Sequence, residues 1–269
     1  MRSVLKGWPC IVHAYFSWIF RYSRHPEKVS LEKRYYKVRQ LILKVCKVLR
    51  FEWKIDSKVD FASLKPSLIV ANHVSLLDPL FLIALSPKPI KFVSKKEARK
   101  MPFVGRILRA LECVFLDRED PRQALKVFGG AVKEIQDGLC SYCIYPEGKR
   151  NNNPYEGEPL PFHAGSLKIA FRSQCPVVLV SSFGEQRIFG SNDAHRSALV
   201  NFKVHEPIAF EEYGTSNTQV LAEKLHHQVY EDVSLFRVED AEYENSDRIK
   251  HYGSKWWKFP PFASIKETK

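Results

Sequence analysis

A histidine and an aspartate lie five residues apart, directly after an apolar run at 67–71. His73 comes first, and Asp78 is followed at once by Pro79. A carboxylate that hydrogen-bonds one imidazole nitrogen selects the tautomer, and the other nitrogen can then remove a proton from a hydroxyl group. The pair therefore predicts general-base catalysis by His73, with Asp78 orienting the ring.

The same pair has a structural alternative. An Asp-Pro step is typical of a helix start, so Asp78 could be an N-cap with Pro79 at the first helical position. Side chains five residues apart point about 140° away from each other on an ideal helix, so the pair can meet only if His73 precedes the helix. A second pair with this spacing, His227 and Asp232, lies inside an amphipathic helix that we expect at 217–233. We interpret that second pair as surface positions.

A short cationic turn follows the apolar run at 140–145. It reads Glu147-Gly148-Lys149-Arg150. Glycine lets backbone amides approach an anion, and arginine can hold a phosphate through two parallel hydrogen bonds. Glu147 could accept a hydrogen bond from a substrate hydroxyl or orient Arg150. The turn indicates a phosphate site, with an ordinary polar turn as the alternative.

One more arginine, Arg118, follows the apolar run at 113–116. If both runs are strands of one parallel sheet, Arg118 and the cationic turn lie at the same sheet edge. Arg118 could instead pair with Asp117 or Glu119 in solvent, where such a pair contributes little. The spacing leaves both arrangements open.

Short apolar runs alternate with helical patterns from residue 66 onward. One helix is expected to begin after its N-cap Asp120 and to end at Gly138. This alternation predicts an α/β fold with a mixed, largely parallel sheet flanked by helices. Chemistry is expected at the carboxyl ends of such strands, where both candidate motifs stand. The predicted strands are 67–71, 90–93, 113–116, 140–145, 177–181 and 198–204.

The chain is basic, and the excess is concentrated at its start. The net charge is +12 over 269 residues, and the first 60 residues hold 14 Lys and Arg against 5 Asp and Glu. This balance indicates an anionic partner, which could be nucleic acid, a membrane surface or a phosphorylated substrate. An apolar stripe at 35–50 faces a row of lysines, and with the apolar run at 8–20 it could form a helical hairpin in the lipid interface. The alternative is a helix that packs on the main domain.

We divide the chain into an N-terminal amphipathic helical membrane-associating motif at 1–58, an α/β domain at 59–235 and a C-terminal tail at 236–269. No apolar run reaches the ~20 residues that a membrane-spanning helix needs, and the run at 8–20 has no signal-peptide cleavage site after it. The six cysteines are scattered and lie mostly in apolar runs, which indicates buried thiols in a reducing compartment. Cys140 and Cys143 would face opposite sides of a strand, so we expect no metal site there.

The motifs form four blocks in order along roughly residues 66–182. They are Asn72-His73-x4-Asp78, Phe115-Leu116-Asp117-Arg118, Tyr145-Pro146-Glu147-Gly148-Lys149-Arg150, and Phe162-x-x-Gly165 with Pro176-Val177-Val178. In order and spacing these blocks resemble the motif blocks of the glycerolipid acyltransferases, and they are most similar to those of lysophosphatidate acyltransferases. Four blocks in order are far more specific than any single one.

The resemblance implies an enzyme that makes phosphatidic acid. His73 would remove the proton of the sn-2 hydroxyl of lysophosphatidate, which attacks the thioester of acyl-carrier protein or coenzyme A, and Asp78 would orient His73. It also implies that no metal or cofactor is needed, and that a two-helix motif binds an anionic membrane surface on the cytoplasmic side of the cell membrane. The residues assigned to the phosphate pocket are Arg118, Glu147, Gly148, Lys149 and Arg150.

Four positions depart from the family pattern. Lys149 stands where the family usually has Thr, and Tyr145 where it commonly has Phe. Glu112 replaces a frequent Gly, and Leu179-Val180 stands in place of the second proline of the last block. The additional cation of Lys149 either strengthens the phosphate site or faces solvent, and Leu179-Val180 predicts a local geometry in the fourth block that differs from the family's.

Three alternatives remain open on the sequence. The acceptor could be glycerol 3-phosphate or another lysophospholipid. A serine hydrolase could use Ser75 beside His73, although no Gly-x-Ser-x-Gly motif is present. A non-catalytic basic protein could bind a membrane or nucleic acid through residues 1–60, but we expect no nucleic-acid partner.

Overall fold

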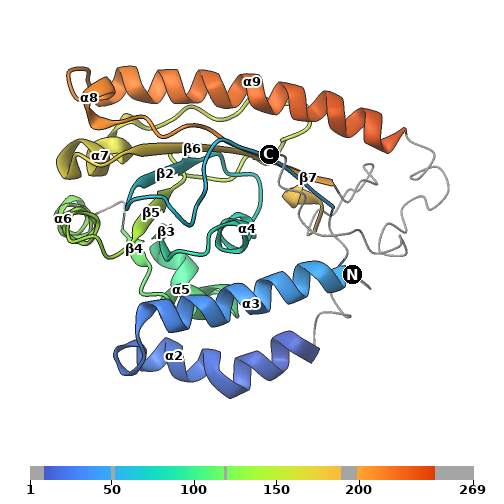
Figure 1. Ribbon diagram of the computed structural model, residues 1–269, viewed down its shortest axis with the longest axis vertical. Coiled ribbons are helices and arrows are strands. Elements are labelled where there is room, and N and C mark those ends of the chain that lie inside the picture. The colour runs from blue at the N-terminus through green and yellow to red at the C-terminus, as the bar shows by residue number, and fades with distance from the viewer. Residues whose placement is uncertain (1–8, 50–51, 118–119, 189–198, 246–269) are drawn as a thin grey trace.

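The computed structural model describes residues 9–49, 52–117, 120–188 and 199–245. Its centre is a seven-stranded sheet with the order β1-β7-β6-β2-β5-β3-β4 (Figure 1). The strands are β1 (Glu52–Ser57), β2 (Leu68–Ala71), β3 (Ile90–Lys95), β4 (Val114–Leu116), β5 (Ser141–Ile144), β6 (Val177–Phe183) and β7 (Leu199–Val204).

Five strands of the sheet run in one direction. β2 pairs in parallel with β5 and β6, and β3 pairs in parallel with β5 and β4. β7 is antiparallel to β6, and β1 is parallel to β7. The predicted α/β fold with a mixed, largely parallel sheet is confirmed, and each of the six predicted strands is present.

Strand β1 was not expected, because residues 52–57 had been placed in the helical N-terminal segment. The segment does carry a two-residue period that we did not use, because Trp53 and Ile55 alternate with charged residues, and Ile55 is buried in this edge strand. The Trp53 ring packs on Phe81 and Phe202, with ring centroids 5.2 and 5.8 Å away. Tertiary contacts therefore place this segment in the sheet.

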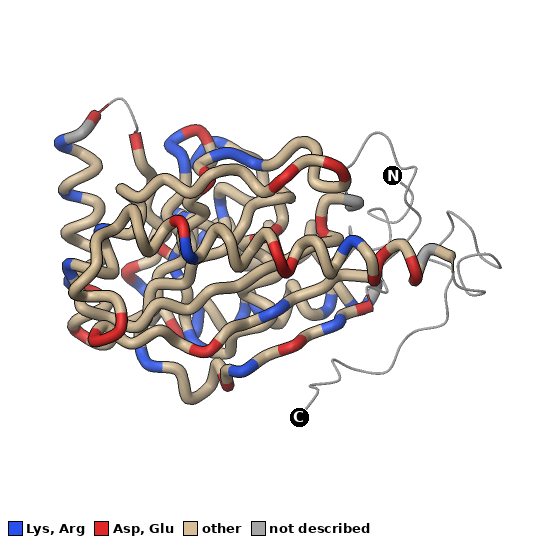
Figure 2. Tube along the Cα trace, turned by 90° about the horizontal axis from the view of Figure 1, so that it is seen from above, with Lys and Arg blue, Asp and Glu red and all other residues tan. Residues whose placement is uncertain are grey.

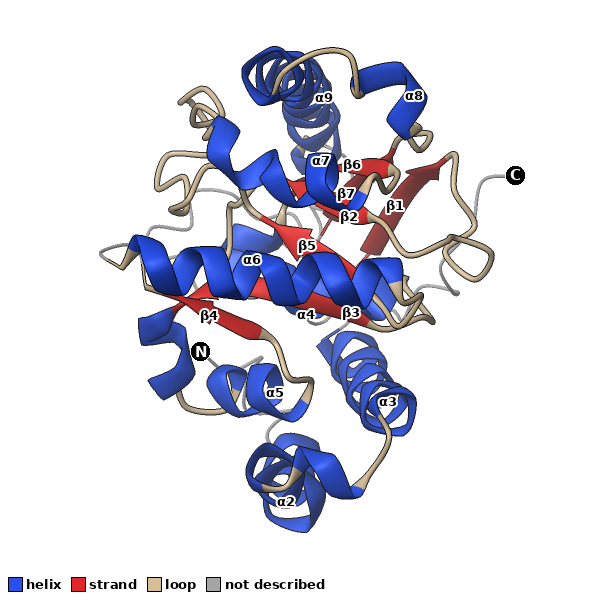
Figure 3. Cartoon of the chain, turned by 90° about the vertical axis from the view of Figure 1, so that its left-hand side faces the viewer, coloured by secondary structure: helices blue, strands red, loops and turns tan. Residues whose placement is uncertain are grey.

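The sheet is covered by helices on both faces. In β2, Ile69 and Ala71 join a core with α3, α4 and α5, whereas Leu68 and Val70 join a core with α6, α7 and α9. All four side chains are buried, which explains why the strand sequence is continuously apolar. In Figure 3, α7 and α9 lie above the sheet, and α3, α5 and α2 lie below it. The helices are α2 (Phe20–Arg24), α3 (Leu31–Leu49), α4 (Asp78–Leu85), α5 (Val104–Ala110), α6 (Pro121–Gln136), α7 (Lys168–Ser173), α8 (Phe210–Tyr213) and α9 (Thr218–Glu244).

The N-terminal helices pack on the α/β domain. α2 continues a π-helical segment, Tyr15–Ile19, and contacts α5, while α3 contacts α4. The apolar stripe of α3 is turned inward, since Tyr35, Val38 and Leu41 are buried. The lysines of α3 remain exposed on the other side. Packing on the domain therefore accounts for the stripe, and within the described residues no helix is long and apolar enough to cross a bilayer.

Helix α9 is longer than the sequence indicated. We expected a helix over 217–233, but it runs from Thr218 to Glu244, and Asn217 caps its start by accepting from two backbone amides. The inward face of the helix continues after 233 with Phe236 and Asp240 buried, and the apolar period is lost there because one of these buried positions is an aspartate. The part of the predicted tail at 246–269 lies outside the described residues.

The two helical layers differ in charge. Residues 9–49 carry nine Lys and Arg against two Glu, whereas α9 carries two Lys and Arg against seven Asp and Glu. Figure 2 shows acidic positions spaced along α9, and Figures 1 and 3 place α9 and the α2–α3 pair on opposite sides of the sheet. The molecule therefore has a basic side and an acidic side.

Candidate active site

His73 lies in the loop between β2 and α4, and Asp78 is the first residue of α4. His73 Nδ1 is 2.8 Å from Asp78 Oδ2. The Asp78 side chain is 3% exposed and that of His73 is 20% exposed. Within the described part of the chain, no hydrogen bond engages Nε2 of His73. The predicted meeting of the two side chains is confirmed, with one imidazole nitrogen held and the other open.

The Asp78 carboxylate is not a helix cap. Oδ2 accepts from the backbone N–H groups of Val74 and Ser75, at 2.9 and 3.0 Å. Both donors precede the helix, and the N-cap residue Leu77 makes no side-chain cap. The structural alternative for Asp78 is therefore wrong. The carboxylate turns back to shape the loop that carries His73.

The backbone around His73 is fixed by neighbouring strands. Glu147 Oε1 accepts from the His73 N–H at 2.7 Å, and the Asn151 N–H donates to the His73 carbonyl at 2.8 Å. The Asn72 amide exchanges two hydrogen bonds with the backbone of Ser182 on β6, at 2.8 and 2.9 Å. Asn72 and Asn151 had no assigned role in the sequence, because their partners are distant along the chain.

Tyr145 lies against the catalytic candidate. Its ring stacks on the His73 imidazole, with centroids 4.4 Å apart and planes 24° apart. Burial raises the pKa of Tyr145 well above its ordinary value, so the hydroxyl stays protonated. The ring plane of His73 is thus set by Tyr145 on its face and by Asp78 at its edge.

Glu147 does not occupy the place that we predicted for it. The residue is 3% exposed, and its Oε1 accepts from the His73 backbone N–H. That oxygen is therefore not available to a substrate hydroxyl. Burial raises the pKa of Glu147 to about 8, and the charge of Asp78 adds to this effect. The residue supports the loop of His73, and its separation of 74 residues in sequence concealed that contact.

The rest of the cationic turn is at the surface. Gly148 adopts φ +70° and donates to the Tyr145 carbonyl at 3.0 Å, which is a conformation that favours glycine. Lys149 and Arg150 follow it and are exposed. Because β5 neighbours β2, this turn and His73 share one edge of the sheet. Arg118 lies outside the described residues, so its predicted position is not tested.

Ser75 is held away from a nucleophilic role. Its side chain is buried, and Oγ accepts from the Leu77 N–H at 3.2 Å. This is a turn contact typical of serine before a helix. Within the described residues, no group of three or more His, Cys, Asp or Glu side chains is arranged to hold a metal ion.

The second histidine–aspartate pair is not a pair of surface positions. His227 is exposed, but Asp232 is buried in α9 against the sheet. Its carboxylate accepts from Ser181 Oγ and His205 Nε2, both at 2.6 Å, and from Lys203 Nζ at 2.8 Å. Burial acts to raise the pKa of Asp232, but the hydrogen bonds outweigh it and hold the pKa below its usual range. The sequence interpretation was wrong because the basic partners come from β7 and its end, far from α9 in sequence.

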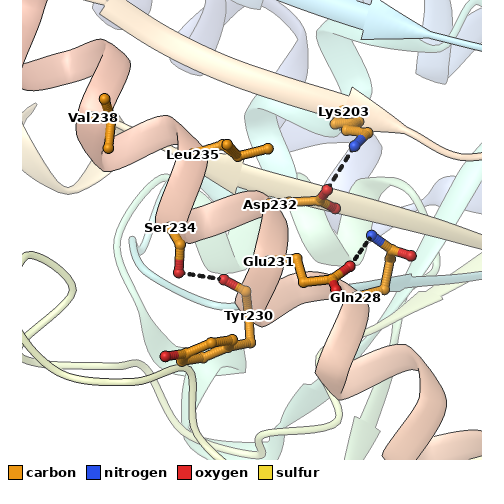
Figure 4. Close-up of a pocket in the computed structure, with 8 residues that line it drawn as sticks. All are labelled: Lys203, Gln228, Tyr230, Glu231, Asp232, Ser234, Leu235 and Val238. Atoms are coloured by element: carbon orange, nitrogen blue, oxygen red, sulfur yellow. Dashed lines mark hydrogen bonds and ion pairs between the residues drawn. The ribbon is translucent and has the colours of Figure 1, made fainter.

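Figure 4 shows Asp232 reaching from α9 toward Lys203 of β7 at the base of a surface hollow. The residues that line this surface pocket come from α9 and β7, and not from the loops after β2 and β5 that contain the His73 site. The pocket's lining residues are Lys203, Gln228, Tyr230, Glu231, Asp232, Ser234, Leu235 and Val238. The cluster at its base fastens α9 to the sheet.

A histidine–aspartate pair thus stands at the carboxyl end of the central parallel strand β2, beside the cationic turn after β5. Residues 54–182 match the family model described as Acyltransferase. The resemblance to the glycerolipid acyltransferases is therefore confirmed. The match begins inside β1, in agreement with that strand being part of the domain.

Several similar proteins are named 1-acyl-sn-glycerol-3-phosphate acyltransferases. The 1-acyl-sn-glycerol-3-phosphate acyltransferase of Helicobacter pylori is 36% identical over 148 residues, which cover 52% of this chain and 60% of that protein. A probable 1-acyl-sn-glycerol-3-phosphate acyltransferase of Mycoplasma genitalium is 29% identical over 211 residues, covering 72% of this chain and 74% of that protein. The chain spans 45 to 74% of the length of the first relatives it matches.

A solved structure shares the fold. The 1-acyl-sn-glycerophosphate acyltransferase PlsC of Thermotoga maritima superposes with a TM-score of 0.64 over 88% of this chain and 96% of that chain, at 21% identity. At this identity the likeness concerns the fold.

Proposed function

We propose that this protein transfers a fatty acyl group from an acyl thioester to the sn-2 hydroxyl of lysophosphatidate, making phosphatidic acid. The observation that carries the proposal is the contact of 2.8 Å between His73 Nδ1 and Asp78 Oδ2, which leaves Nε2 open at a strand end. The names of the similar proteins support the choice of acceptor.

The chemistry is direct transfer. His73 Nε2 takes the proton of the acceptor hydroxyl, and the oxygen attacks the thioester carbonyl, so the acyl C–S bond breaks and the thiol leaves with a proton. Asp78 keeps the proton of the resting imidazole on Nδ1 and stabilises the imidazolium that forms. Holding both reactants at this edge accounts for much of the rate.

The acceptor phosphate binds the exposed cations after β5. Lys149 and Arg150 follow the Gly148 turn, and an arginine fork can bind a phosphate through two hydrogen bonds. Arg118, which follows β4 in the sequence, contributes a third cation. The donor is acyl-carrier protein or coenzyme A carrying the acyl chain.

The basic side of the molecule faces an anionic membrane. Residues 9–49 carry the charge excess, with Phe16 and Tyr36 exposed among these cations at 76% and 62%. Apolar side chains enter the interface while lysines stay at the headgroups. Association is peripheral or monotopic, on the cytoplasmic side of the cell membrane.

One experiment tests acceptor and donor together. Purified protein is incubated with lysophosphatidate, glycerol 3-phosphate or lysophosphatidylcholine, and with acyl-carrier protein or coenzyme A thioesters, and the lipid products are resolved. We expect phosphatidic acid from lysophosphatidate, none with His73→Ala, and full activity with His227→Ala, an exposed histidine on α9.

Other outcomes point to the alternatives. Acylation of glycerol 3-phosphate or lysophosphatidylcholine alone would change the acceptor. Free fatty acid with an acyl group on Ser75 would indicate a hydrolase. Activity retained by His73→Ala would exclude the proposed base.

A further inference from the structure

Glu147 holds the peptide group of His73 from the neighbouring strand end. Oε1 accepts from the His73 N–H at 2.7 Å, while the Asn151 N–H donates to the His73 carbonyl at 2.8 Å. Both polar backbone groups of His73 are therefore bound by the loop after β5. Glu147 is buried, so water competes little for this contact.

The position of this peptide group decides where Nε2 lies. The imidazole is already restricted by Asp78 at Nδ1 and by the Tyr145 ring on its face. What remains is the position of the His73 backbone, which the bonds to Glu147 and Asn151 fix together. A displacement of ~1 Å between base and hydroxyl can lower a rate by ~100-fold.

We propose that Glu147 is a positioning residue, which places the His73 base through the His73 backbone N–H and does not bind the acceptor. This inference rests on the proposed function, because it concerns the same reaction. Oε1 of Glu147 is bonded to the His73 backbone N–H, and Oε2 is buried. A residue that binds the acceptor would instead present a carboxylate oxygen to the accessible side of the site.

The charge state of Glu147 supports this role. Burial raises the pKa to about 8, Asp78 adds to the rise, and the backbone amides of His73 and Leu160 oppose it. The raised pKa favours the neutral form of the carboxyl group near pH 7, and Oε2 has no hydrogen-bond partner among the described residues. A neutral group avoids a second buried anion beside Asp78.

Two substitutions separate positioning from binding. Glu147→Gln is the isostere of the neutral carboxyl group and keeps the accepting oxygen, so kcat and the KM for lysophosphatidate should stay within about threefold of the wild type. Glu147→Leu removes the acceptor oxygen, and kcat should fall ~10- to 100-fold with KM within about threefold. Glu156→Gln, an exposed carboxyl group in the same loop, is the control and should match the wild type.

A spectroscopic measurement reads the contact without turnover. In protein labelled with 15N-histidine, the His73 amide is the resonance lost in His73→Asn. We expect it to keep its proton shift in Glu147→Gln and to move upfield in Glu147→Leu, where the hydrogen bond is gone. A wild type that acylates no acceptor would remove the proposed function while this measurement still tests the contact.

The proposal is overturned by a tenfold rise in KM for lysophosphatidate in Glu147→Gln. It is overturned equally if Glu147→Leu keeps full kcat or leaves the His73 amide in place. If circular dichroism shows that Glu147→Leu does not fold, Glu147→Gln decides alone: retained kcat with an unmoved amide supports positioning, and a raised KM contradicts it.

Discussion

Arg34 of α3 forms an ion pair with Glu112, the residue that turns the chain from α5 into β4. The Arg34 side chain is 3% exposed, and it also donates to the Ala110 carbonyl at the end of α5. Glu112 adopts φ +53°, a left-handed conformation that favours the glycine often found there in the family. Glu112 therefore adopts a strained backbone conformation, and its ion pair with Arg34 holds the N-terminal helices against the domain.

Replacing Glu112 separates these two effects. Glu112→Ala keeps the strained backbone and leaves Arg34 without its carboxylate, so the free energy of unfolding should fall by ~1–3 kcal/mol. Glu112→Gly loses the same pair but relieves ~1 kcal/mol of strain, so it should be the more stable of the two. Urea denaturation measures both, and an alanine variant at least as stable as the glycine variant would contradict the account.

Asp78→Asn should lower kcat by ~100- to 10,000-fold with little change in KM. The amide oxygen can still accept from the Val74 and Ser75 N–H groups, but the neutral amide cannot stabilise the imidazolium as the carboxylate does. Steady-state kinetics with lysophosphatidate checks this, and circular dichroism serves as the folding control. A raised KM with unchanged kcat would remove Asp78 from the catalytic pair.

Arg150→Ala should raise the KM for a phosphorylated acceptor ~10- to 100-fold and change kcat less, because a charge-assisted contact to phosphate is worth ~1.5–3 kcal/mol. Arg150→Lys should recover part of the loss. Arg172→Ala removes an exposed arginine from α7 and should leave KM unaltered. An unchanged KM in Arg150→Ala would exclude Arg150 from the phosphate site.

The stability difference between wild type and Glu147→Gln should depend on pH. The pKa of Glu147 is raised from 4.5 to about 8 on folding, so its contribution is complete below pH 4.5 and is lost as pH rises toward 8. The free energy of unfolding of the wild type should fall by on the order of a few kcal/mol relative to that of the variant over this pH range. His73 and Asp78 face residue 147 in both proteins, so their own titration affects both alike. Denaturation between pH 5 and 9 measures it, with Glu156→Gln as control. Parallel curves would show that Glu147 is ionised throughout.

Asp232→Asn should destabilise the fold by ~2–4 kcal/mol at pH 7, because one amide oxygen replaces a buried carboxylate that accepts three hydrogen bonds. The pKa of Asp232 is lowered, so its contribution is complete above pH 3.8 and is lost as pH falls through the folded value. The gap between wild type and variant should therefore narrow in acid. Glu231→Gln, at a half-exposed neighbour, should show no such gap. Equal stability of Asp232→Asn and the wild type at pH 7 would show that Asp232 does not hold α9 against the sheet.

The sequence by itself determined the features that depend on neighbouring residues. A continuous apolar run predicts a strand buried on both faces, and the Asp-Pro step predicts the start of a helix. The loop that contains His73 and ends at Asp78 could therefore be predicted from about ten neighbouring residues. The cationic turn after β5 was readable for the same reason, and the topology rule for parallel sheets placed both motifs at one edge.

Only the tertiary structure decided contacts between distant residues. The bond from Glu147 to His73 spans 74 residues, and the cluster around Asp232 spans up to 51. Burial of a polar side chain depends on what packs over it, and sequence type alone carries no signal for it. For that reason the sequence did not reveal that Glu147, predicted as a substrate ligand, lies buried against the His73 backbone, or that Asp232, predicted as a surface position, is buried between α9 and the sheet.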